Sequence, residues 1–482
     1  MARSTRPRGA ATRGNAATAG AQQVSVWEDD PEPAVQVTRP LPDPSKRPLA
    51  YSFPGRAPAP GGQPGTPSFR YWTAAEALRR GADFWAPRIP SGNWEVGALL
   101  PVLLDQGVDF NAYYDRRALN FFHGPSPSGT VYSGESPDIV CHEMGHAILD
   151  AIKPQLWGAA SHEAAAFHES FGDMSAILSA LQLQSLRSAI LHDTGGHLYQ
   201  NSRLSRLAEQ LGTAIRAQAP DAVNPDCLRN AVNSFTYQDP INLPQMAPAA
   251  QLSSEPHSFS RVFTGAFFEA VAGMLTAKAA NPASPTEQEL LAVSQEMGDI
   301  LVTGARQAPV VSNFYAVVAA AMVQASAGQN PKYPPGLKGV FVRRSILSLH
   351  AATTVEALHQ SVAVAIAPAA AGPTEALDTV ALPAAHYGLD QPLLVESPSH
   401  PRQLYAVSAA ADASSLDPAS SITAARAFVD DLFRRGRVDY NNIGRPEARL
   451  EHGHRLRTHE LVSERGGVRL RRRLFDCGLQ HR

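Results

Sequence analysis

The chain has 482 residues, of which 44% are hydrophobic, and its formal net charge is −2 at pH 7. This length can bury the core of a full enzyme, and the near-neutral charge gives no global field that favours nucleic acid or an anionic membrane as a partner. No apolar run reaches the roughly eighteen residues of a membrane span, and three cysteines are too few for a disulfide framework. We therefore expect a soluble monomer that binds neither nucleic acid nor membrane.

Residues 1–67 are rich in Pro, Gly, Ala and Arg and lack hydrophobic periodicity, which predicts a disordered segment. Their basic start is not followed by an apolar stretch, so no secretory signal is visible. The localisation therefore stays open between the cytoplasm, taken by default, and export by a non-classical route.

The next stretch of the chain predicts both helix and strand. Residues 71–85 have the pattern of a helix, and residues 98–104 that of a strand. A short strand at Asn111 and a hairpin around Phe121 follow.

The helix predicted from Pro137 onward carries the pattern H-E-x-x-H at His142, Glu143 and His146. Ser136 is a good N-cap for this helix. The two histidines are four residues apart, so both rings project from one face of the helix and can share a tetrahedral Zn²⁺. Glu143 lies about 100° further round the helix, where a general base for a zinc-activated water belongs.

A later predicted helix supplies candidates for a third zinc ligand. We assign this role to Glu169, because Asp173 follows one helical turn later and can accept a hydrogen bond from the other ring nitrogen of His142. Glu163 is the rival, but Phe167 stands four residues after it and cannot orient a histidine. The neighbouring histidines 162 and 168 are interpreted as polar helix residues rather than ligands.

The spacing excludes one class of zinc peptidase and resembles another. Metzincins need a glycine and a third histidine three and six residues after the second histidine, where this chain has Leu149 and Ile152. The pattern E-x-x-x-D on a later helix instead resembles the gluzincins, and among them the thermolysin-like and fungalysin-like metalloendopeptidases. That resemblance implies an α+β fold with a β-rich first lobe, a helical second lobe and the zinc site between them. One Zn²⁺ per chain and a peptide or protein substrate are also implied.

The resemblance assigns further roles outside the two ligand helices. Asn111 and Ala112 match the edge strand that holds an extended substrate in the family. His257, in the segment Glu255-Pro256-His257-Ser258, resembles the histidine that donates to the oxyanion, and Arg229 resembles the arginine that binds a substrate carbonyl. These roles come from the family and not from the spacing of the residues.

The chain also departs from the family pattern. Trp157 stands where the family has a tyrosine that assists the oxyanion, and the loop between the second histidine and Glu169 is longer. Asp138 matches one carboxylate of the family's calcium cluster, but residues 174–183 contain no acid that could complete it, so we expect no bound calcium. Residues 1–67 leave no room for the usual folded propeptide.

The resemblance covers residues 68–349, divided into a β-rich lobe with the zinc helices (68–255) and a helical lobe (256–349). Helices are predicted in the second lobe over residues 262–279, 285–304, 312–327 and 336–345. Residues 350–482 form an accessory segment with Ala- and Val-rich residues 351–371, a helix over 422–434 and a hairpin over 455–474 that turns at residues 466–467.

Some conspicuous residues receive a structural interpretation. The arginine run 471–473 is read as a solvated strand face rather than a polyanion site, and Cys141 as a buried helix residue. Histidines 452, 454 and 459 are not expected to bind metal.

The sequence therefore predicts a zinc-dependent metalloendopeptidase that uses His142, His146 and Glu169 as ligands and Glu143 as general base. Two alternatives remain. One is a clan-related aminopeptidase, whose third glutamate would stand at Ala165 and whose G-x-M-E-N strand is not found. The other is a catalytically weak or inactive scaffold that serves as a binding module.

Overall fold

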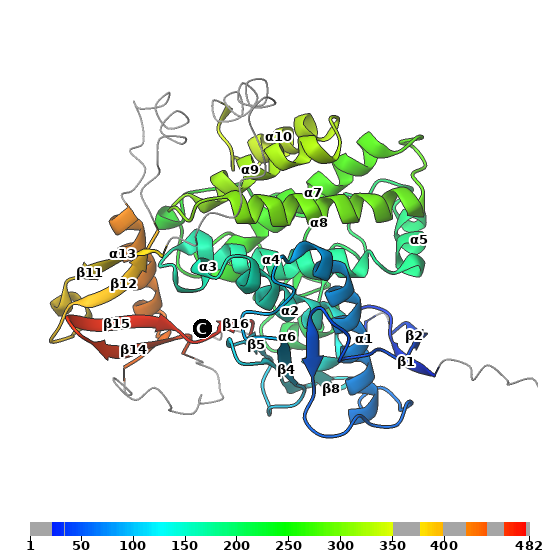
Figure 1. Ribbon diagram of the computed structural model, residues 1–482, viewed down its shortest axis with the longest axis horizontal. Coiled ribbons are helices and arrows are strands. Elements are labelled where there is room, and N and C mark those ends of the chain that lie inside the picture. The colour runs from blue at the N-terminus through cyan, green and yellow to red at the C-terminus, as the bar shows by residue number, and fades with distance from the viewer. Residues whose placement is uncertain (1–21, 33, 350–375, 399–420, 441–456, 479–482) are drawn as a thin grey trace, which may run out of the picture.

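A computed structural model describes residues 22–32, 34–349, 376–398, 421–440 and 457–478. Its helices and strands are mixed, which confirms the α+β class (Figure 1). We refer to residues 22–349 as the main region and to residues 376–478 as the C-terminal region. The C-terminal region lies to one side of the main region in Figure 1, and its last strand returns to the main region.

The expectation of disorder over residues 1–67 is wrong for residues 22–32 and 34–67, while residues 1–21 lie outside the described part. Strands β1 (Gln23–Trp27) and β2 (Gln36–Pro40) form an antiparallel hairpin, and β3 (Ala50–Ser52) pairs with β4. Val24 and Val26 are buried on one face of β1. This short alternation is diluted by the surrounding Pro and Arg, so composition hides it.

A mixed sheet of the described residues underlies the N-terminal half of the main region. Its strand order is β16-β5-β6-β4-β3, with β4 at Leu99–Leu103, β5 at Ala112–Tyr114, β6 at Leu119–Phe121 and β16 at Phe475–Asp476. Strands β7 (His123–Ser126) and β8 (Gly129–Tyr132) form the hairpin that follows. Helix α1 (Pro67–Trp85) lies between β3 and β4 in the chain and buries the rings of Phe69, Trp72 and Trp85.

Two central helices pack closely because glycines face each other at their contact. Helix α2 (Pro137–Ile152) begins with the Ser136 hydroxyl accepting a hydrogen bond from the Ile139 amide, as its sequence predicts. Helix α4 (His162–Ala180) follows the short helix α3 (Gln155–Gly158). A Cβ atom at Gly145 of α2 would lie 2.8 Å from the Cα atom of Gly172 in α4. The close approach explains a helix-interior glycine that otherwise costs about 1 kcal/mol relative to Ala.

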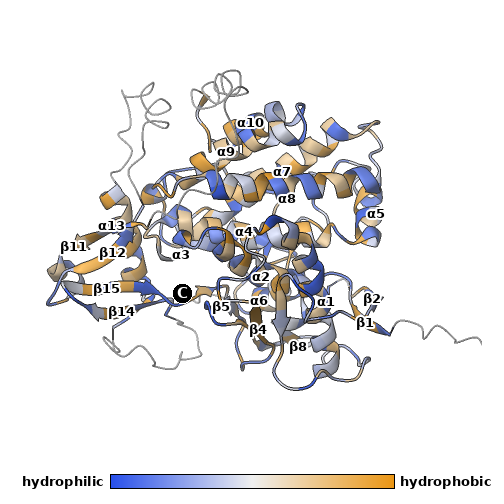
Figure 2. Ribbon diagram, in the orientation of Figure 1, coloured by the Kyte–Doolittle hydropathy of each residue, from blue (hydrophilic) through white to orange (hydrophobic). Residues whose placement is uncertain are grey.

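The segment between α4 and the second half contains α5 (Gln184–Asp193), α6 (Glu209–Arg216) and the short pair β9 (Arg206–Leu207) and β10 (Arg229–Asn230). The four helices predicted after residue 255 are confirmed. Three have bounds within three residues of the prediction, and the first begins six residues earlier than predicted. The four helices are α7 (Pro256–Lys278), α8 (Glu287–Gln307), α9 (Phe314–Gln329) and α10 (Tyr333–Arg343). Figure 2 shows polar and apolar residues alternating along α8, whose inner face buries Leu290 and Val293.

The C-terminal region has its own sheet and core. In the described residues its strand order is β11-β12-β15-β14-β13, and α13 (Ser421–Arg434) packs against it. The strands are β11 (Asp378–Leu382), β12 (Leu393–Ser397), β13 (Val438–Asp439), β14 (His459–Glu464) and β15 (Gly467–Arg472). The predicted helix and the predicted hairpin are both confirmed. Residues 351–371 and histidines 452 and 454 lie outside the described part.

The C-terminal region is tied to the main region rather than appended to it. Asp431 of α13 accepts from the ring of His162, at 2.7 Å from Nε2, and from the Ser254 hydroxyl at 2.8 Å. Strand β16 (Phe475–Asp476) leaves this region and pairs with β5 of the main sheet. Short 3-10 turns complete the described elements, at Ala86–Arg88, Ser133–Glu135, Pro240–Asn242 and Ala384–Tyr387.

Among the described residues, no helix combines the length and the apolar character needed to cross a bilayer.

Candidate metal centre

The three predicted ligands meet where α2 and α4 pack together. The Glu169 Oε2 atom lies 3.4 Å from His142 Nε2 and 3.8 Å from His146 Nε2. All three side chains are buried. In a tetrahedral site with bonds of about 2.0–2.3 Å, neighbouring donor atoms lie about 3.3–3.8 Å apart. The observed spacings are those of donors arranged around one small ion.

A fourth donor comes from Cys477, which the sequence analysis did not connect with the site. Its Sγ atom lies 3.3 Å from His142 Nε2, 3.5 Å from His146 Nε2 and 3.7 Å from Glu169 Oε2. These distances are again edges of a tetrahedron. The residue stands 308 positions after Glu169, so no local spacing could reveal it. The sequence around it offers one indication only, which is a cysteine that follows an apolar and an acidic residue at 475–476 and precedes a glycine.

The chemistry of this donor set fits a divalent cation. Two imidazoles, a carboxylate and a thiol converge in a buried space, where the donor atoms lie within 4.8 Å of one another. Burial, together with the carboxylates of Glu143 and Glu169, raises the pKa of the Cys477 thiol well above its usual range. A cation bound at this point would instead lower the pKa of the Cys477 thiol, because thiolate is the form that ligates metal.

Glu143 lies beside the donors without belonging to them. The residue is fully buried, and among the described residues no N–H or O–H donor pairs with either carboxylate oxygen. Burial raises the pKa of its carboxyl to about 7. A carboxyl with a pKa near neutrality can both accept and return a proton under physiological conditions.

The predicted contact between Asp173 and His142 is present. The Asp173 Oδ1 atom lies 3.0 Å from His142 Nδ1, which leaves Nε2 directed at the other donors. Burial would raise the pKa of Asp173, but Arg229 and His142 outweigh it and lower the pKa to about 2. The ionised carboxylate therefore fixes the ring orientation of His142.

Arg229 is located behind His142. Its guanidinium donates to both carboxylate oxygens of Asp173, at 2.7 Å from Nη2 to Oδ1 and 3.1 Å from Nε to Oδ2. The arginine therefore reinforces the Asp173–His142 pair. It also lines the cleft beside the donors, which is where its predicted contact with a substrate carbonyl would occur.

His257 lies in the first turn of α7, within reach of the donor set. Its Nε2 atom is 3.1 Å from Glu169 Oε2, and its Nδ1 atom is 2.8 Å from Glu255 Oε1. Burial alone would lower the pKa of His257, but the two carboxylates outweigh it and raise the pKa to about 10. The ring is therefore cationic at neutral pH and can donate a hydrogen bond.

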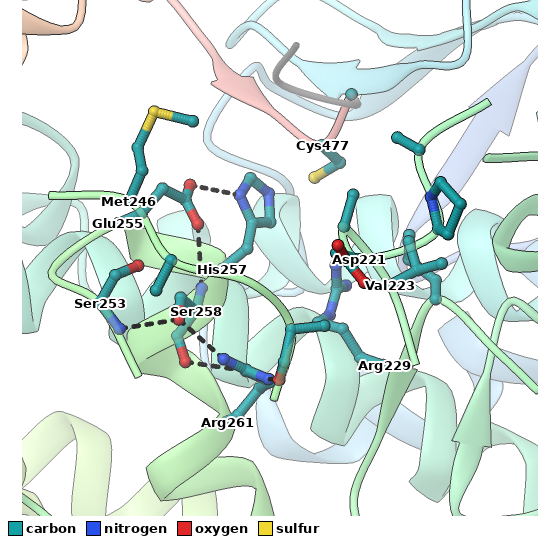
Figure 3. Close-up of a pocket in the computed structure, with 17 residues that line it drawn as sticks. Asp221, Val223, Arg229, Met246, Ser253, Glu255, His257, Ser258, Arg261 and Cys477 are labelled. Atoms are coloured by element: carbon teal, nitrogen blue, oxygen red, sulfur yellow. Dashed lines mark hydrogen bonds and ion pairs between the residues drawn. The ribbon is translucent and has the colours of Figure 1, made fainter. Parts of the chain in front are cut away.

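A cleft of about 440 Å³ opens next to these residues. Figure 3 shows the Cys477 side chain reaching over it from the C-terminal strand, with His257 on one side and Arg229 on the other. Ser258 and Arg261 of α7, Asp221 and Met246 are among the other residues that line the cleft.

The role predicted for Trp157 is not available to it in this structure. Its indole N–H donates to the backbone carbonyl of Arg472 at 3.3 Å. Its ring is buried between Tyr114 and Phe475, at centroid distances of 5.6 and 5.2 Å. The indole ring, which is larger than the tyrosine ring of the family, lies against the C-terminal segment. It therefore does not point at the donor set.

Asn111 and Ala112 lie beside the donors, at the start of β5. The Ala112 carbonyl accepts a hydrogen bond from the Cys477 amide at 3.1 Å. Asn111 packs on Gly478, where an added Cβ atom would approach the Asn111 Cγ atom to 2.6 Å. The strand predicted to hold a substrate thus holds residues 475–478 of the chain itself.

The rival ligands have other partners. Glu163 accepts from the Tyr237 hydroxyl at 2.7 Å and from the Tyr315 amide at 2.6 Å, away from the donor set. His168 is buried and stacks on Phe475, with ring centroids 4.1 Å apart. Glu169, and not Glu163, is the acid that joins the two histidines.

A second acidic group lies at the start of α2. Carboxylate oxygens of Asp30, Asp138 and Glu209 lie within 4.8 Å of one another. Burial raises the pKa of Asp30 to about 7 and that of Glu209 to about 9. The acids that join Asp138 thus come from residues 30 and 209, outside residues 174–183, where the family resemblance implies a calcium carboxylate. The expectation of no bound calcium stays a prediction.

The cationic run 471–473 does not form one exposed face. Arg471 is about half exposed and pairs with Glu460 at 2.6 Å, whereas Arg472 is buried and donates to the Trp157 carbonyl at 2.9 Å. Arg472 thus helps to attach the C-terminal segment to the main region.

Comparisons with known proteins leave the site to be judged on its own geometry. No protein-family model matches the chain, and no curated protein is significantly similar to it.

Proposed function

We propose that this protein is a zinc-dependent endopeptidase of the gluzincin type, with the thermolysin-like arrangement of a β-rich lobe and a helical lobe around the metal. The observation that carries the proposal is the convergence of His142, His146 and Glu169 beside the buried carboxylate of Glu143, which accepts from no N–H or O–H donor of the described residues. A purely structural metal site needs no such carboxylate.

His142, His146 and Glu169 would hold the Zn²⁺, with Asp173 and Arg229 orienting His142 from behind. A bound Zn²⁺ supplies a Lewis acid that polarises a peptide carbonyl and lowers the pKa of a water molecule to about 7. Glu143 accepts the proton of that water on a carboxylate oxygen and returns it to the leaving amine. The cationic ring of His257 stabilises the charge that develops on the carbonyl oxygen.

Strand β5 supports the assignment of a peptide substrate. It borders the donor set, and its outer edge carries backbone groups that pair with an extended chain, since the Ala112 carbonyl accepts from the Cys477 amide. Extended peptides are recognised in this way when they add a strand to a sheet edge.

A narrow apolar space beside Arg229 supports a preference for small apolar side chains. It has a volume of about 20 Å³, and Ile139, Leu207 and Leu228 are among the residues that line it. Its small volume leaves no room for a bulky side chain.

The test combines metal analysis with cleavage of a broad peptide library by the full chain and by its Cys477→Ser variant. We expect one zinc per chain and chelator-sensitive cleavage of internal peptide bonds, lost in Glu143→Gln without loss of zinc. Release of single N-terminal residues would favour the aminopeptidase alternative.

A second candidate is favoured by Cys477. Four protein donors are typical of structural zinc sites, which do not catalyse. On that interpretation the protein is an inactive scaffold, and zinc-loaded protein would cleave nothing even when the thiol is removed. That outcome would overturn the peptidase proposal.

A further inference from the structure

The C-terminal segment, residues 474–478, passes directly through the candidate site. Strand β16 pairs antiparallel with β5, with Phe475 opposite Tyr114 and Asp476 opposite Tyr113. In the described sheet β5 has β6 on its other side, so β16 occupies the edge that an added peptide strand would use. Figure 1 shows this strand running from the C-terminal region to β5.

At the donor set this segment presents a side chain instead of a backbone carbonyl. The Cys477 Sγ atom faces the two histidine nitrogens and the Glu169 oxygen at 3.3–3.7 Å. A thiolate is a stronger zinc ligand than water, and a thiolate at the metal places no peptide carbonyl there. A segment bound in this way therefore resists cleavage.

Several contacts on both sides of Cys477 fit the segment to this place. The Phe475 ring stacks on His146 and on His168, at centroid distances of 4.9 and 4.1 Å. Asp476 forms a buried ion pair with Arg437 at 2.7 Å. An added Cβ atom at Gly478 would lie 2.6 Å from the Asn111 Cγ atom, so a side chain there would displace either the buried Asn111 amide or the segment. The contacts are specific, but the paired strand is only two residues long.

We propose that the C-terminal segment is an autoinhibitory pseudo-substrate, in which the Cys477 thiolate is the fourth ligand of the metal and β16 fills the substrate strand position. The proposal rests on the proposed function for the meaning of inhibition, but the ligation itself does not depend on catalysis. Closing would be a ligand exchange: the thiol gives its proton to the solvent, a sulfur–metal bond forms, and the bond between the metal and a water molecule breaks. No oxidant or reductant takes part.

Opening follows when the thiol is removed or blocked. Iodoacetamide forms a sulfur–carbon bond with Cys477, iodide leaves and the thiol proton is released, so the alkylated sulfur no longer competes as a thiolate. Substitution by serine has the same effect. If the closed form holds about nine-tenths of the molecules, opening raises the apparent activity about tenfold.

The test uses the full chain loaded with Co²⁺, because thiolate ligation of Co²⁺ produces an intense charge-transfer absorption in the near ultraviolet. We expect this band in the wild-type protein and in Cys227→Ser, a control cysteine that lies outside the site. We expect it to be absent from Cys477→Ser, which retains one metal per chain and cleaves peptides about tenfold faster. Mass spectrometry should find Cys477 protected from iodoacetamide by metal and exposed after chelation.

A second variant keeps the thiol and guards against a folding defect in the first. Gly478→Val forces the segment away from Asn111, and it should weaken the charge-transfer band and raise cleavage in the same direction. Absence of the band in wild-type protein, or its persistence in Cys477→Ser, would overturn the inference even if peptides are cleaved. A band without cleavage by any variant would retain the ligation and reject the peptidase instead.

Discussion

At the scale of single residues, the chemistry depends on which acidic side chains are paired and which are not. Glu169 shares its oxygen with two histidines and His257, whereas Glu163, six residues earlier on α4, is held by Tyr237 and Tyr315. Both are buried glutamates on one helix. Only their neighbouring residues distinguish Glu169, the proposed metal ligand, from Glu163, which has a structural role.

Glu163→Gln and Glu169→Gln form a matched pair for the ligand assignment. We expect Glu169→Gln to lower zinc occupancy strongly, because an amide oxygen is a poor ligand, and Glu163→Gln to leave occupancy unchanged. Metal content after dialysis measures both. Loss of zinc in Glu163→Gln alone would mean that the assignment is wrong.

Glu163 also predicts a pH dependence of stability. Burial raises the pKa of its carboxyl from 4.5 to about 8. Between these values the folded chain keeps a proton that the unfolded chain releases, so the free energy of unfolding falls as the pH rises from about 4.5 to about 8. The slope is at most about 1.4 kcal/mol per pH unit. Urea titrations at several pH values should show a flatter profile for Glu163→Gln, and an unchanged profile would contradict this account.

Asp173 tests the orientation of His142. Asp173→Asn keeps the shape of the side chain but removes the charge that pairs with Arg229 and His142. Loss of such a partner typically costs about 10–100-fold in metal affinity. A competition titration with a zinc indicator measures the change, and an affinity equal to the wild-type value would contradict the proposed positioning role.

At the scale of elements, the proposed ligands are brought together by the tight contact between α2 and α4. Gly145 and Gly172 permit it, and an added Cβ atom at Gly172 would also lie 2.6 Å from His142 Nδ1. Neither glycine carries any chemistry of its own, yet each sets the distance between the two histidines and Glu169.

Gly145→Ala should therefore destabilise the fold, by about 1–3 kcal/mol as for other overpacked sites. Gly273→Ala on α7 is the matched control, since nothing lies within 4 Å of its would-be Cβ atom. There the helix propensity of Ala should stabilise by up to about 1 kcal/mol. Chemical denaturation compares the two, and a Gly145→Ala protein as stable as wild type would show that the contact is not tight.

The sequence predicted the periodic elements well and the non-local ones poorly. Helices α1, α2 and α7 to α10 follow from apolar periodicity and caps such as Ser136, which act within a few residues. The candidate metal donors on α2 and α4 could be predicted because helical spacing fixes their geometry. The partners of Trp157 and Asn111 could not be foreseen, because both contact residues 472–478, which only the tertiary fold brings close.

At the scale of the whole molecule, the C-terminal region covers the edge of β5 next to the candidate site. Its core packs on the start of α4, and the His162–Asp431 contact fixes the two regions together. Further along the chain, Arg472 donates to the Trp157 carbonyl and the Phe475 ring packs on the Trp157 ring. The chain thus runs past Trp157 to β5. The same connection explains why a region outside the family resemblance bears on the chemistry.

The most direct test of the central claim is the ratio of kcat/KM for an internally quenched peptide between Cys477→Ser and Cys477→Ser/Glu143→Gln, both loaded with one zinc per chain. Removal of the general base in Cys477→Ser/Glu143→Gln should lower kcat/KM by about 10²–10⁴-fold relative to Cys477→Ser, while the zinc content of the two variants stays equal. Equal values for the two variants, or no cleavage by zinc-loaded Cys477→Ser of any peptide in a broad library, would contradict the account.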